Sequence, residues 1–461
     1  MRGLLKFLLI LVVLAAIVGG GMWFWAGRGE GPQIQLKSPE RFVGQNTPLE
    51  LAVSSPDGQF TRVEVTVEQN GKTMPVFSLD QPTSGEVKQD AAEQLFISRP
   101  IGKQALPELQ AGKARIVVRA ARPVFYGMRV LESEAARDVE VRLEPPRVAV
   151  LSTFHYINHG GAEFVVLRAT PADVAAGVRV GDKEYPAFPA SGVGITIDPA
   201  MRVAFFGLLQ DQDLKTPIEV FARDPAGNEA KAMLDHMPFP KRFRQSRIQI
   251  DDRFLNHVVP QIAAASPQMN YSTMPEDLLD SFLKINGDLR RRNNEQIAQL
   301  AAQTAPQMLW KGPFKPLVNA AVEAGFADNR TYIYKGKEVD RQVHLGFDLA
   351  VTQHIQVPAA HHGKVIHAGD LGIYGNCVIL DHGLGVQSLY AHLSSIGVKV
   401  GDTVEMGQEL GRSGTTGLAL GDHLHFTMLL NGNPVNAVEW WDPKWNEDRV
   451  YRKIRAAGGG V

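Results

Sequence analysis

The sequence has a single cysteine, Cys377, and no excess of charge of either sign. One cysteine excludes an intramolecular disulfide and a zinc site built from several thiolates, so any metal would need histidine and carboxylate ligands. The 48 Lys and Arg residues balance 49 Asp and Glu residues to a net charge of −1. That balance gives no bulk attraction to nucleic acid, and we expect no nucleic-acid partner. A chain of 461 residues is long enough for about three domains.

Charged residues are absent from one long apolar stretch, residues 7–27. About 20 such residues cross the hydrocarbon core of a bilayer as a helix. Arg2 and Lys6 precede the stretch, so the positive-inside rule predicts a cytoplasmic N-terminus and an export of the rest to the periplasm or another extracytoplasmic space. A cleaved signal peptide is the alternative, but Gly19–Trp23 offers no convincing small-x-small cleavage site. We therefore expect residues 1–30 to form a single-pass anchor in the cytoplasmic membrane.

Alternating apolar residues follow the anchor. Val63, Val65 and Val67 precede an Asn-Gly turn, and the same period of two recurs up to about residue 239. This pattern predicts two β-sandwich modules, plausibly immunoglobulin-like, at residues 31–144 and 145–239. We interpret them mainly as a spacer that sets the reach from the membrane; binding of the cell wall or of a partner is the alternative.

The pattern changes twice more. Helical spacing after residue 240 predicts a helical connector at 240–312, and glycine-punctuated apolar runs predict a mostly β domain at 313–446, followed by a tail at 447–461. The fold class is thus mainly β and multidomain. The sequence leaves open whether the connector covers a neighbouring site and whether a regulatory protein partner acts on it.

Nine of the thirteen histidines lie between His344 and His425. His344 and Asp348 are four residues apart, a spacing that puts them on one face of either a helix or a strand. Gly346 favours the extended form, with His344, Gly346 and Asp348 on one face, and would allow an ion or backbone to approach closely.

Further histidines can reach the same cavity. Alternation sends His423 and His425 to one strand face while Leu424 and Phe426 face a core, and His392 stands at the end of another strand. Together these segments supply three ligands of the two-His, one-carboxylate kind and two histidines beside them. Such a zinc ion keeps a fourth position for water, and the extra histidines can move protons and stabilise charge.

The ordered motifs HxxxD, YAHL and GxHLHF resemble those of the lysostaphin-type (LytM) zinc metallopeptidases, which cut peptide bonds in bacterial peptidoglycan. The resemblance runs from His344 to about Trp441. It implies a LytM-type β-sheet domain in which His344, Asp348 and His425 bind one Zn²⁺, with His392 and His423 as the catalytic pair. It also implies peptidoglycan stem or bridge peptides as substrate.

Two segments depart from the family pattern. Leu418–Leu420 replaces a small polar stretch before the last motif, and a longer segment at residues 326–337 replaces a short turn upstream of His344. The remaining histidines of the window match no ligand position and are expected to be exposed or structural: His354, His361, His362, His367 and His382.

The sequence thus predicts a membrane-anchored zinc endopeptidase acting on peptidoglycan. The alternative is a catalytically silent scaffold of the same fold that activates another wall hydrolase. In proteins of that kind the resemblance implies the loss of one or more ligands, whereas all five positions are filled here.

Overall fold

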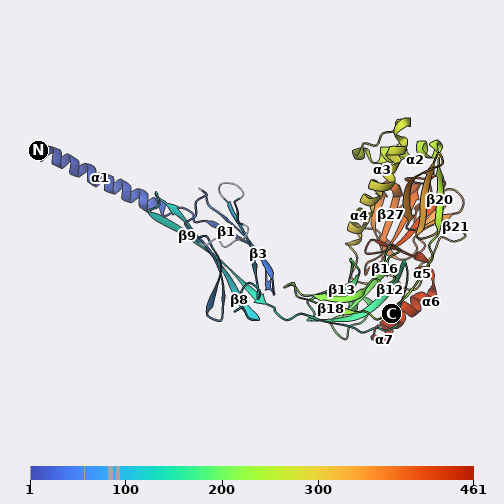
Figure 1. The fold of residues 1–461 in the computed structure, drawn as a ribbon, viewed down its shortest axis with the longest axis horizontal. Helices are drawn as coiled ribbons and strands as arrows, with labels where there is room; N and C mark the ends of the chain where they lie inside the picture. Colours follow the sequence, from blue (N-terminus) through green and yellow to red (C-terminus); the bar gives the residue numbers. More distant parts are fainter. Residues whose placement is uncertain (1, 57, 81–86, 90–93, 461) are drawn as a thin grey trace. The chain divides into compact units, whose positions relative to one another are not determined.

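The computed structural model describes residues 2–56, 58–80, 87–89 and 94–460 (Figure 1). Its contacts divide the chain into two compact units. One comprises Met1–Pro146 with Arg223–Glu229, and the other comprises Arg147–Ala222 with Ala230–Val461. Each unit is built mainly from β-strands, as the short runs of alternating apolar residues predicted.

The first unit begins with a long apolar helix, α1 (Arg2–Ala26). Residues Gly3–Ala26 are long and apolar enough to cross a membrane, and they are exposed in the structure. Two sheets follow. The first is ordered β1 (Gln33–Ser38), β3 (Thr47–Ser54), β7 (Gln94–Ile101), β6 (Val87–Gln89). The second is ordered β2 (Phe42–Val43), β9 (Arg129–Val141), β8 (Gly112–Val124), β4 (Arg62–Gln69), β5 (Lys72–Ser78).

One apolar core lies between these two sheets. Strand β4 shows how the sequence builds it, because its buried residues alternate strictly with half-buried ones. Val63, Val65 and Val67 therefore all face Leu51 and Ile97 in the same buried cluster. The predicted β-strands are present here, whereas the bounds of the module and its immunoglobulin-like character stay predictions.

The second unit opens with another set of strands. One four-stranded sheet is ordered β10 (Arg147–Val150), β12 (Gly161–Thr170), β16 (Met201–Leu208), β15 (Phe188–Pro189). The other is ordered β14 (Lys183–Pro186), β13 (Ala175–Val180), β17 (Ile218–Arg223), β18 (Glu229–Met233). A parallel pair, β11 (His155–Asn158) and β19 (His236–Phe239), completes the set.

The rest of the second unit is a β domain with helices beside it. Its large antiparallel sheet is ordered β21 (Ala321–Ala324), β24 (Phe347–Ala350), β32 (Leu424–Leu430), β28 (Val386–Leu393), β27 (Asn376–Asp381), β26 (Gly363–Asp370), β30 (Thr403–Val404), with β33 (Asn433–Val435) beside β32. Two three-stranded sheets adjoin it. They are β20 (Gln245–Ile250), β22 (Asp328–Tyr334), β23 (Lys337–His344), and β25 (Gln356–Pro358), β31 (Glu409–Arg412), β29 (Ser395–Ile396).

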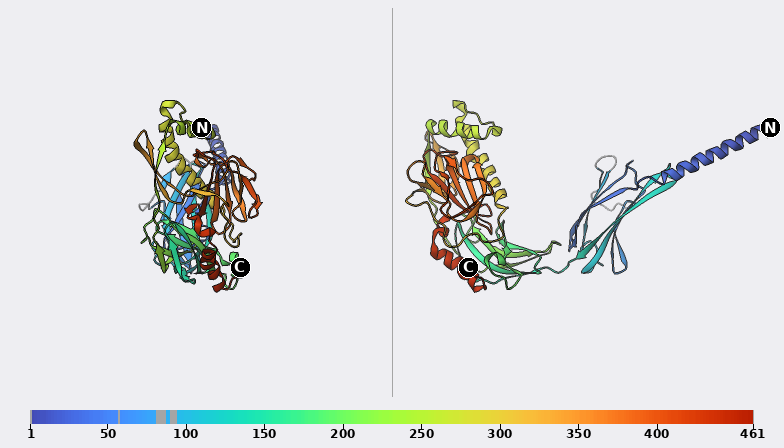
Figure 2. Two further views of the ribbon diagram at one scale, coloured as in Figure 1. Left: turned by 90° about the vertical axis from the view of Figure 1, so that its right-hand side faces the viewer. Right: turned by 180° about the vertical axis from the view of Figure 1, so that it is seen from behind.

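Both faces of the large sheet are covered. The helices α2 (Asp252–Ala265), α3 (Leu278–Lys284) and α4 (Arg290–Ala301) lie beside this sheet (Figure 2). Ile297 of α4 packs with Ile379 and Leu429 on one face. Met428 and Tyr390, on the other face, belong to a core that continues into the strands of the second module. Strands β28 and β32 are buried along their whole length for this reason, while Leu424 and Phe426 face the core as the alternation predicted.

An aromatic cluster makes this core continuous. Phe164 and Phe205 of the second module have ring centroids 4.8 Å apart, and Phe205 lies 5.5 Å from Trp440 of α5 (Ala437–Trp441). Trp440 in turn packs on Trp310. The predicted boundaries at residues 145, 240 and 313 stay a proposal, and the structure groups everything from Arg147 onward, apart from Arg223–Glu229, into one unit.

Two segments differ from their predicted conformation. The segment predicted as a helical connector begins with strand β20, which pairs in parallel with β22. The segment predicted as a tail, 447–461, is helical through a π-helical stretch (Asn446–Tyr451) and α7 (Arg452–Ala456), and α6 (Pro443–Trp445) precedes it. Val450 and Ile454 are buried, and the apolar spacing of four that buries them was the available signal.

Candidate metal centre

The three predicted ligands meet at one point. Strand β23 ends at His344, and Asp348 of β24 lies directly opposite His425 of β32 in the sheet register. The Nε2 atom of His344 is 2.9 Å from Asp348 Oδ1 and 3.0 Å from His425 Nδ1, and the last two atoms are 2.9 Å apart. All three side chains are buried. Among the described residues they form a cluster that can hold a metal ion.

The chain reaches this geometry through a break that the sequence analysis missed. The prediction of one extended strand through His344, Gly346 and Asp348 is wrong, because β23 ends at His344 and β24 begins at Phe347. The chain passes at this break from the small sheet to the large one. Gly346 permits the passage, since an added Cβ would lie 2.5 Å from both His425 Nε2 and Thr427 Oγ1. The atoms that approach the glycine closely belong to side chains, and the predicted approach of an ion or backbone stays a prediction.

The surrounding hydrogen bonds assign the protons of both imidazoles. His344 Nδ1 lies 3.1 Å from the Gly325 carbonyl oxygen, which only accepts, so Nδ1 carries the proton and Nε2 is a bare lone pair. Thr427 Oγ1 donates to the Leu345 carbonyl and accepts from His425 Nε2 at 3.0 Å. His425 Nδ1 is therefore also unprotonated. Two imidazole lone pairs and a carboxylate oxygen face one another.

The electrostatic environment favours an ionised Asp348 and a neutral His425. Burial alone would raise the pKa of Asp348, but the three neighbouring imidazoles outweigh it and hold that pKa well below its usual range. Burial lowers the pKa of His425 to about 4. An ionised carboxylate and neutral imidazoles are the forms that bind metals. Three electron-pair donors within 3.0 Å repel one another unless a cation lies among them, so this donor set fits a metal ion.

Two further histidines stand beside this cluster, as predicted. His392 donates from Nδ1 to the Thr416 carbonyl at 2.7 Å, and His423 donates from Nδ1 to the Gly421 carbonyl at 2.7 Å. The Nε2 atom of each ring is thereby left as an acceptor. The two ring centroids are 4.9 Å apart, and His423 Nε2 is 3.5 Å from Asp348 Oδ1. The structure thus brings all five predicted residues together.

The backbone at His392 explains how its ring enters the site. Its φ of 62° lies in the left-handed region, which is uncommon for a residue other than glycine. The residue stands near the end of β28, where this conformation turns the chain towards the Thr416 loop. Burial lowers the pKa of His392 well below its usual range. Burial also lowers the pKa of His423, but the Asp348 carboxylate more than compensates and raises it.

Arg330 is a site residue that the sequence analysis did not single out. Its guanidinium donates from Nη2 to Asp348 Oδ2 at 3.0 Å, which leaves the other carboxylate oxygen to the histidines. Asp328 adds a second carboxylate 3.6 Å from Arg330 Nε. Arg330 lies in the segment 326–337 that departs from the family pattern. Its period-two spacing with Asp328 and Tyr332 was a signal that the three side chains share a strand face.

A cavity of about 360 Å³ surrounds the five residues. Besides the five residues, Glu323–Ala324 and Ile373–Tyr374, three parts of the second unit line it. The predicted connector contributes Ile248, Phe254 and Arg290, and the β22 face contributes Arg330 and Tyr332. The third part is the segment from Leu418 to Gly421, which includes the apolar stretch that departs from the family pattern. The connector helices therefore form part of the wall of the cavity.

The other histidines of the window lie outside this cavity. His382 is fully buried, donates from Nδ1 to the His362 carbonyl and bonds Ser388 Oγ through Nε2, and burial lowers its pKa to about 3. His361 bonds the Lys311 carbonyl, and burial lowers its pKa as well. His354 is exposed. None of these rings contacts the three clustered ligands in the bonds described for them.

Comparison with known proteins identifies the C-terminal domain. The family model "Peptidase family M23" matches residues 342–437, a range that contains all five site residues. The DD-carboxypeptidase/endopeptidase Mpg of Neisseria meningitidis is 41% identical over 97 residues, which are 21% of this chain and 22% of that protein. The peptidoglycan DD-endopeptidase ShyA of Vibrio cholerae is 38% identical over 96 residues, again 21% and 22% of the two chains.

A solved structure described as a putative peptidase M23 from Pseudomonas aeruginosa matches 61% of this chain and 92% of its own, with 20% identity and a TM-score of 0.37. The chain spans about a fifth of the length of the curated relatives it matches. The match of the family model to the segment that carries HxxxD, YAHL and GxHLHF confirms the resemblance found in the sequence: residues 342–437 are a LytM-type domain of peptidase family M23.

Proposed function

We propose that this protein is a zinc-dependent endopeptidase that hydrolyses peptide bonds in bacterial peptidoglycan while anchored to the cytoplasmic membrane by α1. The observation that carries the proposal is the convergence of two unprotonated imidazole nitrogens and one carboxylate oxygen within 3.0 Å. His344, Asp348 and His425 would hold the ion. Two histidines and one carboxylate are a common ligand set of catalytic zinc, which keeps a position open.

Bound zinc would supply Lewis acidity, which makes a water molecule more acidic and polarises the scissile carbonyl. The chain's own residues then move the protons. The Nε2 atom of His392 or His423 is an acceptor held in place by its Nδ1–H bond to a backbone carbonyl. One ring takes the proton of the attacking water as the water oxygen bonds to the carbonyl carbon. The protonated ring returns that proton to the amine nitrogen as the carbon–nitrogen bond breaks.

The relatives support peptidoglycan as the substrate, because one of them is described as a peptidoglycan DD-endopeptidase. The peptide bonds in question lie in the stem or bridge peptides of the polymer. The apolar helix α1 supports the location, because Arg2 and Lys6 precede its core and would keep the N-terminus cytoplasmic. The remaining 430 or so residues would then lie outside the cytoplasm, where peptidoglycan is found.

The test uses the full chain purified in detergent. Zinc per chain is measured, and the protein is incubated with purified peptidoglycan with and without a chelator. We expect about one zinc per chain, chelator-sensitive release of peptide fragments, and fragment masses that identify the bond. Bound zinc without cleavage of any peptidoglycan would overturn the enzymatic assignment in favour of a silent scaffold.

Two variants separate the roles within the site. His344→Ala should lose zinc and activity together. His392→Ala should retain zinc and lose about 10²- to 10⁴-fold in turnover, the range typical for loss of a general acid or base. Equal loss of zinc in both variants would contradict the division into ligands and proton carriers.

A further inference from the structure

The longest hairpin of the first unit extends beyond its sheet. Strands β8 and β9 pair along 13 residues each, from Gly112 opposite Val141 to Val124 opposite Arg129. Strand β4 covers β8 only as far as Ala121. Among the described residues, no further strand pairs with the ribbon beyond Ala121. A two-stranded ribbon is only marginally stable in water on its own, so its packing partner matters.

The tip of this ribbon is apolar and exposed. We call residues 122–131 the β8–β9 tip. Tyr126 is 92% exposed and Met128 is 72% exposed, and Val130 is also exposed. Phe125 packs edge-on against Tyr126, and both residues adopt positive φ values that are unusual for aromatic side chains. The turn thus presents large apolar side chains to the surroundings of the protein.

The β8–β9 tip packs against the end of α1. The Arg129 guanidinium lies 4.4 Å from the centre of the Trp23 ring and donates to the Trp23 carbonyl. Arg122 donates to the Glu30 carbonyl just after the helix. Figure 1 shows the ribbon reaching the last turns of the helix. Arg129 lies level with Trp23, and the exposed turn at Tyr126 and Met128 lies further along the ribbon. The turn is therefore level with Trp23 or closer to the N-terminus of the helix, within the stretch long enough to span a bilayer.

The charged residues within the tip are of one sign, and the acidic residues Glu30 and Glu132 lie just outside it. The sequence from Pro123 to Leu131 contains no acidic residue, and neither does α1. Arg28, Arg122 and Arg129 surround the junction, and Arg28 stacks over the Phe24 ring. Aromatic rings together with arginines are the composition found where proteins meet lipid headgroups. Arginines close to anionic headgroups add electrostatic attraction to the membrane surface.

We propose that the β8–β9 tip is a second membrane-contacting element, which inserts Tyr126 and Met128 into the headgroup region of the outer leaflet beside α1. The occupant of this surface is the phospholipid bilayer itself. The inference rests on the proposed membrane anchoring by α1 and extends it, since a helix alone leaves the module free to tilt. Contact at two places fixes the orientation of the first module relative to the membrane surface.

The experiment places an environment-sensitive fluorophore on the full chain in vesicles of phosphatidylethanolamine and phosphatidylglycerol. Tyr126→Cys and Met128→Cys supply two labelling positions, and the native Cys377 is fully buried and should stay unlabelled. Lipids with a nitroxide near the headgroup serve as quenchers. We expect blue-shifted emission at both positions and loss of most of the intensity when the quencher is present.

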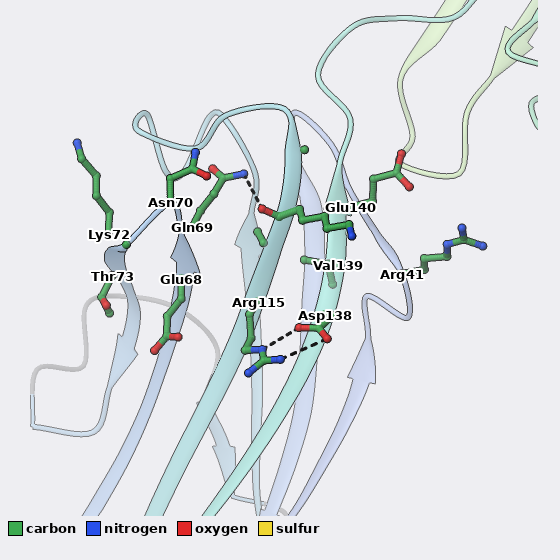
Figure 3. Close-up of a pocket in the computed structure, with 14 residues that line it drawn as sticks. Arg41, Glu68, Gln69, Asn70, Lys72, Thr73, Arg115, Asp138, Val139 and Glu140 are labelled. Atoms are coloured by element: carbon green, nitrogen blue, oxygen red, sulfur yellow. Dashed lines mark hydrogen bonds and ion pairs between the residues drawn. The ribbon is translucent and has the colours of Figure 1, made fainter.

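Thr73→Cys is the matched control, because it is exposed at the opposite end of the same module. Figure 3 shows this end, where Thr73 and Lys72 line a hollow of about 920 Å³ near the Arg115–Asp138 ion pair. The 13 residues of β8 separate the two ends by about 40 Å. A probe at position 73 should emit as in water.

Three outcomes overturn the inference. If the chain stays in the vesicles but probes at 126 and 128 are as weakly quenched as the probe at 73, the tip is in water and only the helix anchors. If all three probes are quenched alike, the module lies flat and the tip has no special role. If alkaline carbonate extracts the chain from the vesicles, the proposed anchor fails and the tip proposal fails with it.

Discussion

Two groups of charged side chains are buried in the second unit, and their hydrogen bonds are completed in different ways. At the junction between β12 and the C-terminal helices, Lys453 Nζ donates to Glu163 Oε1 at 2.7 Å and to the Phe164 carbonyl at 2.8 Å. The backbone N–H of Tyr156 donates to the other oxygen of Glu163. Donors and acceptors match there. At the metal centre, acceptors face acceptors.

The difference teaches how a functional cluster can be told from a structural one. A buried ion pair whose hydrogen bonds are complete requires no ligand, and its main effect is on the stability of the fold. A buried set of lone pairs without a donor is costly as it stands, and a ligand must supply the missing positive charge. Burial and charge alone do not distinguish the two clusters, whereas the positions of the protons do.

The sharpest test of this comparison exchanges a carboxylate for an amide at each kind of position. Asp348→Asn should abolish zinc binding, because the anionic ligand is lost and an amide nitrogen or oxygen replaces it. The control is Asp381→Asn in β27 of the same sheet, where Thr304 and the Ala305 N–H already donate to the carboxylate. Zinc per folded chain, measured after gel filtration, should fall only in the first variant; a similar fall in both would remove the distinction.

The second prediction concerns the complete cluster. Lys453→Met leaves the Glu163 carboxylate buried without its cation, and removal of one partner of a buried pair typically costs about 3–5 kcal/mol of stability. Lys444→Met is the control, because Lys444 pairs with Asp448 at the surface, where such pairs contribute roughly 0–1 kcal/mol. Urea unfolding of both variants at equal zinc gives the difference, and zinc affinity of the folded proteins should not change. A weaker zinc affinity in Lys453→Met would show that the two clusters are coupled.

The two clusters also differ in how far the sequence predicted them. His423 stands just before β32 and His425 two residues later within it, and His344 and Asp348 are four apart, so short motifs and a family resemblance were enough to name them. Glu163 and Lys453 are 290 residues apart, and no local pattern links them. The same holds for the core that joins Phe205 to Trp440, which turns separately predicted segments into one unit.

Local geometry at the site was predicted less well than its composition. The break at Gly346 depends on the side chains of His425 and Thr427, which come from a strand about 80 residues later. The contribution of the connector to the cavity wall depends on the parallel pairing of β20 with β22. Such pairings between distant segments are decided by the packing of the whole unit, and period-two or helical spacing within one segment carries no information about them.

A pH dependence of stability follows from Glu439, which lies next to the complete cluster. Its carboxylate is buried and accepts from Asn158 Nδ2 and the Ala162 N–H, while Glu163 and Lys241 exert opposing charge effects. Burial outweighs the hydrogen bonds and raises the pKa of Glu439 from 4.5 to about 7. A raised carboxyl pKa means that the folded state holds the proton more tightly than the unfolded state does. The protonated Glu439 therefore adds to the free energy of unfolding below pH 4.5, and this contribution is lost as the pH rises towards 7.

Glu439→Gln removes this titration. Relative to the variant, the wild type should lose about 3 kcal/mol of unfolding free energy between pH 4.5 and 7, since each unit of pKa shift corresponds to about 1.4 kcal/mol. Urea unfolding of both proteins across this range measures the difference, and groups that titrate in both proteins cancel. Parallel curves for the two proteins would mean that Glu439 keeps an ordinary pKa in its buried position.

The smallest expected effect tests whether the metal centre depends on the ion pair between Arg330 and Asp348. Arg330 holds Asp348 Oδ2 and so directs Oδ1 towards the histidines. Arg330→Gln keeps a hydrogen-bond donor but removes the positive charge and the planar guanidinium group. Loss of a residue that hydrogen-bonds to a metal ligand typically lowers metal affinity about 10- to 100-fold. Competition with a zinc chelator measures this affinity without any assay of peptide cleavage. Arg341→Gln, on the neighbouring strand with an exposed partner in Glu338, should leave the affinity unchanged. If Arg330→Gln binds zinc as tightly as the wild type, the strands alone orient Asp348, and Arg330 contributes only to the wall of the cavity.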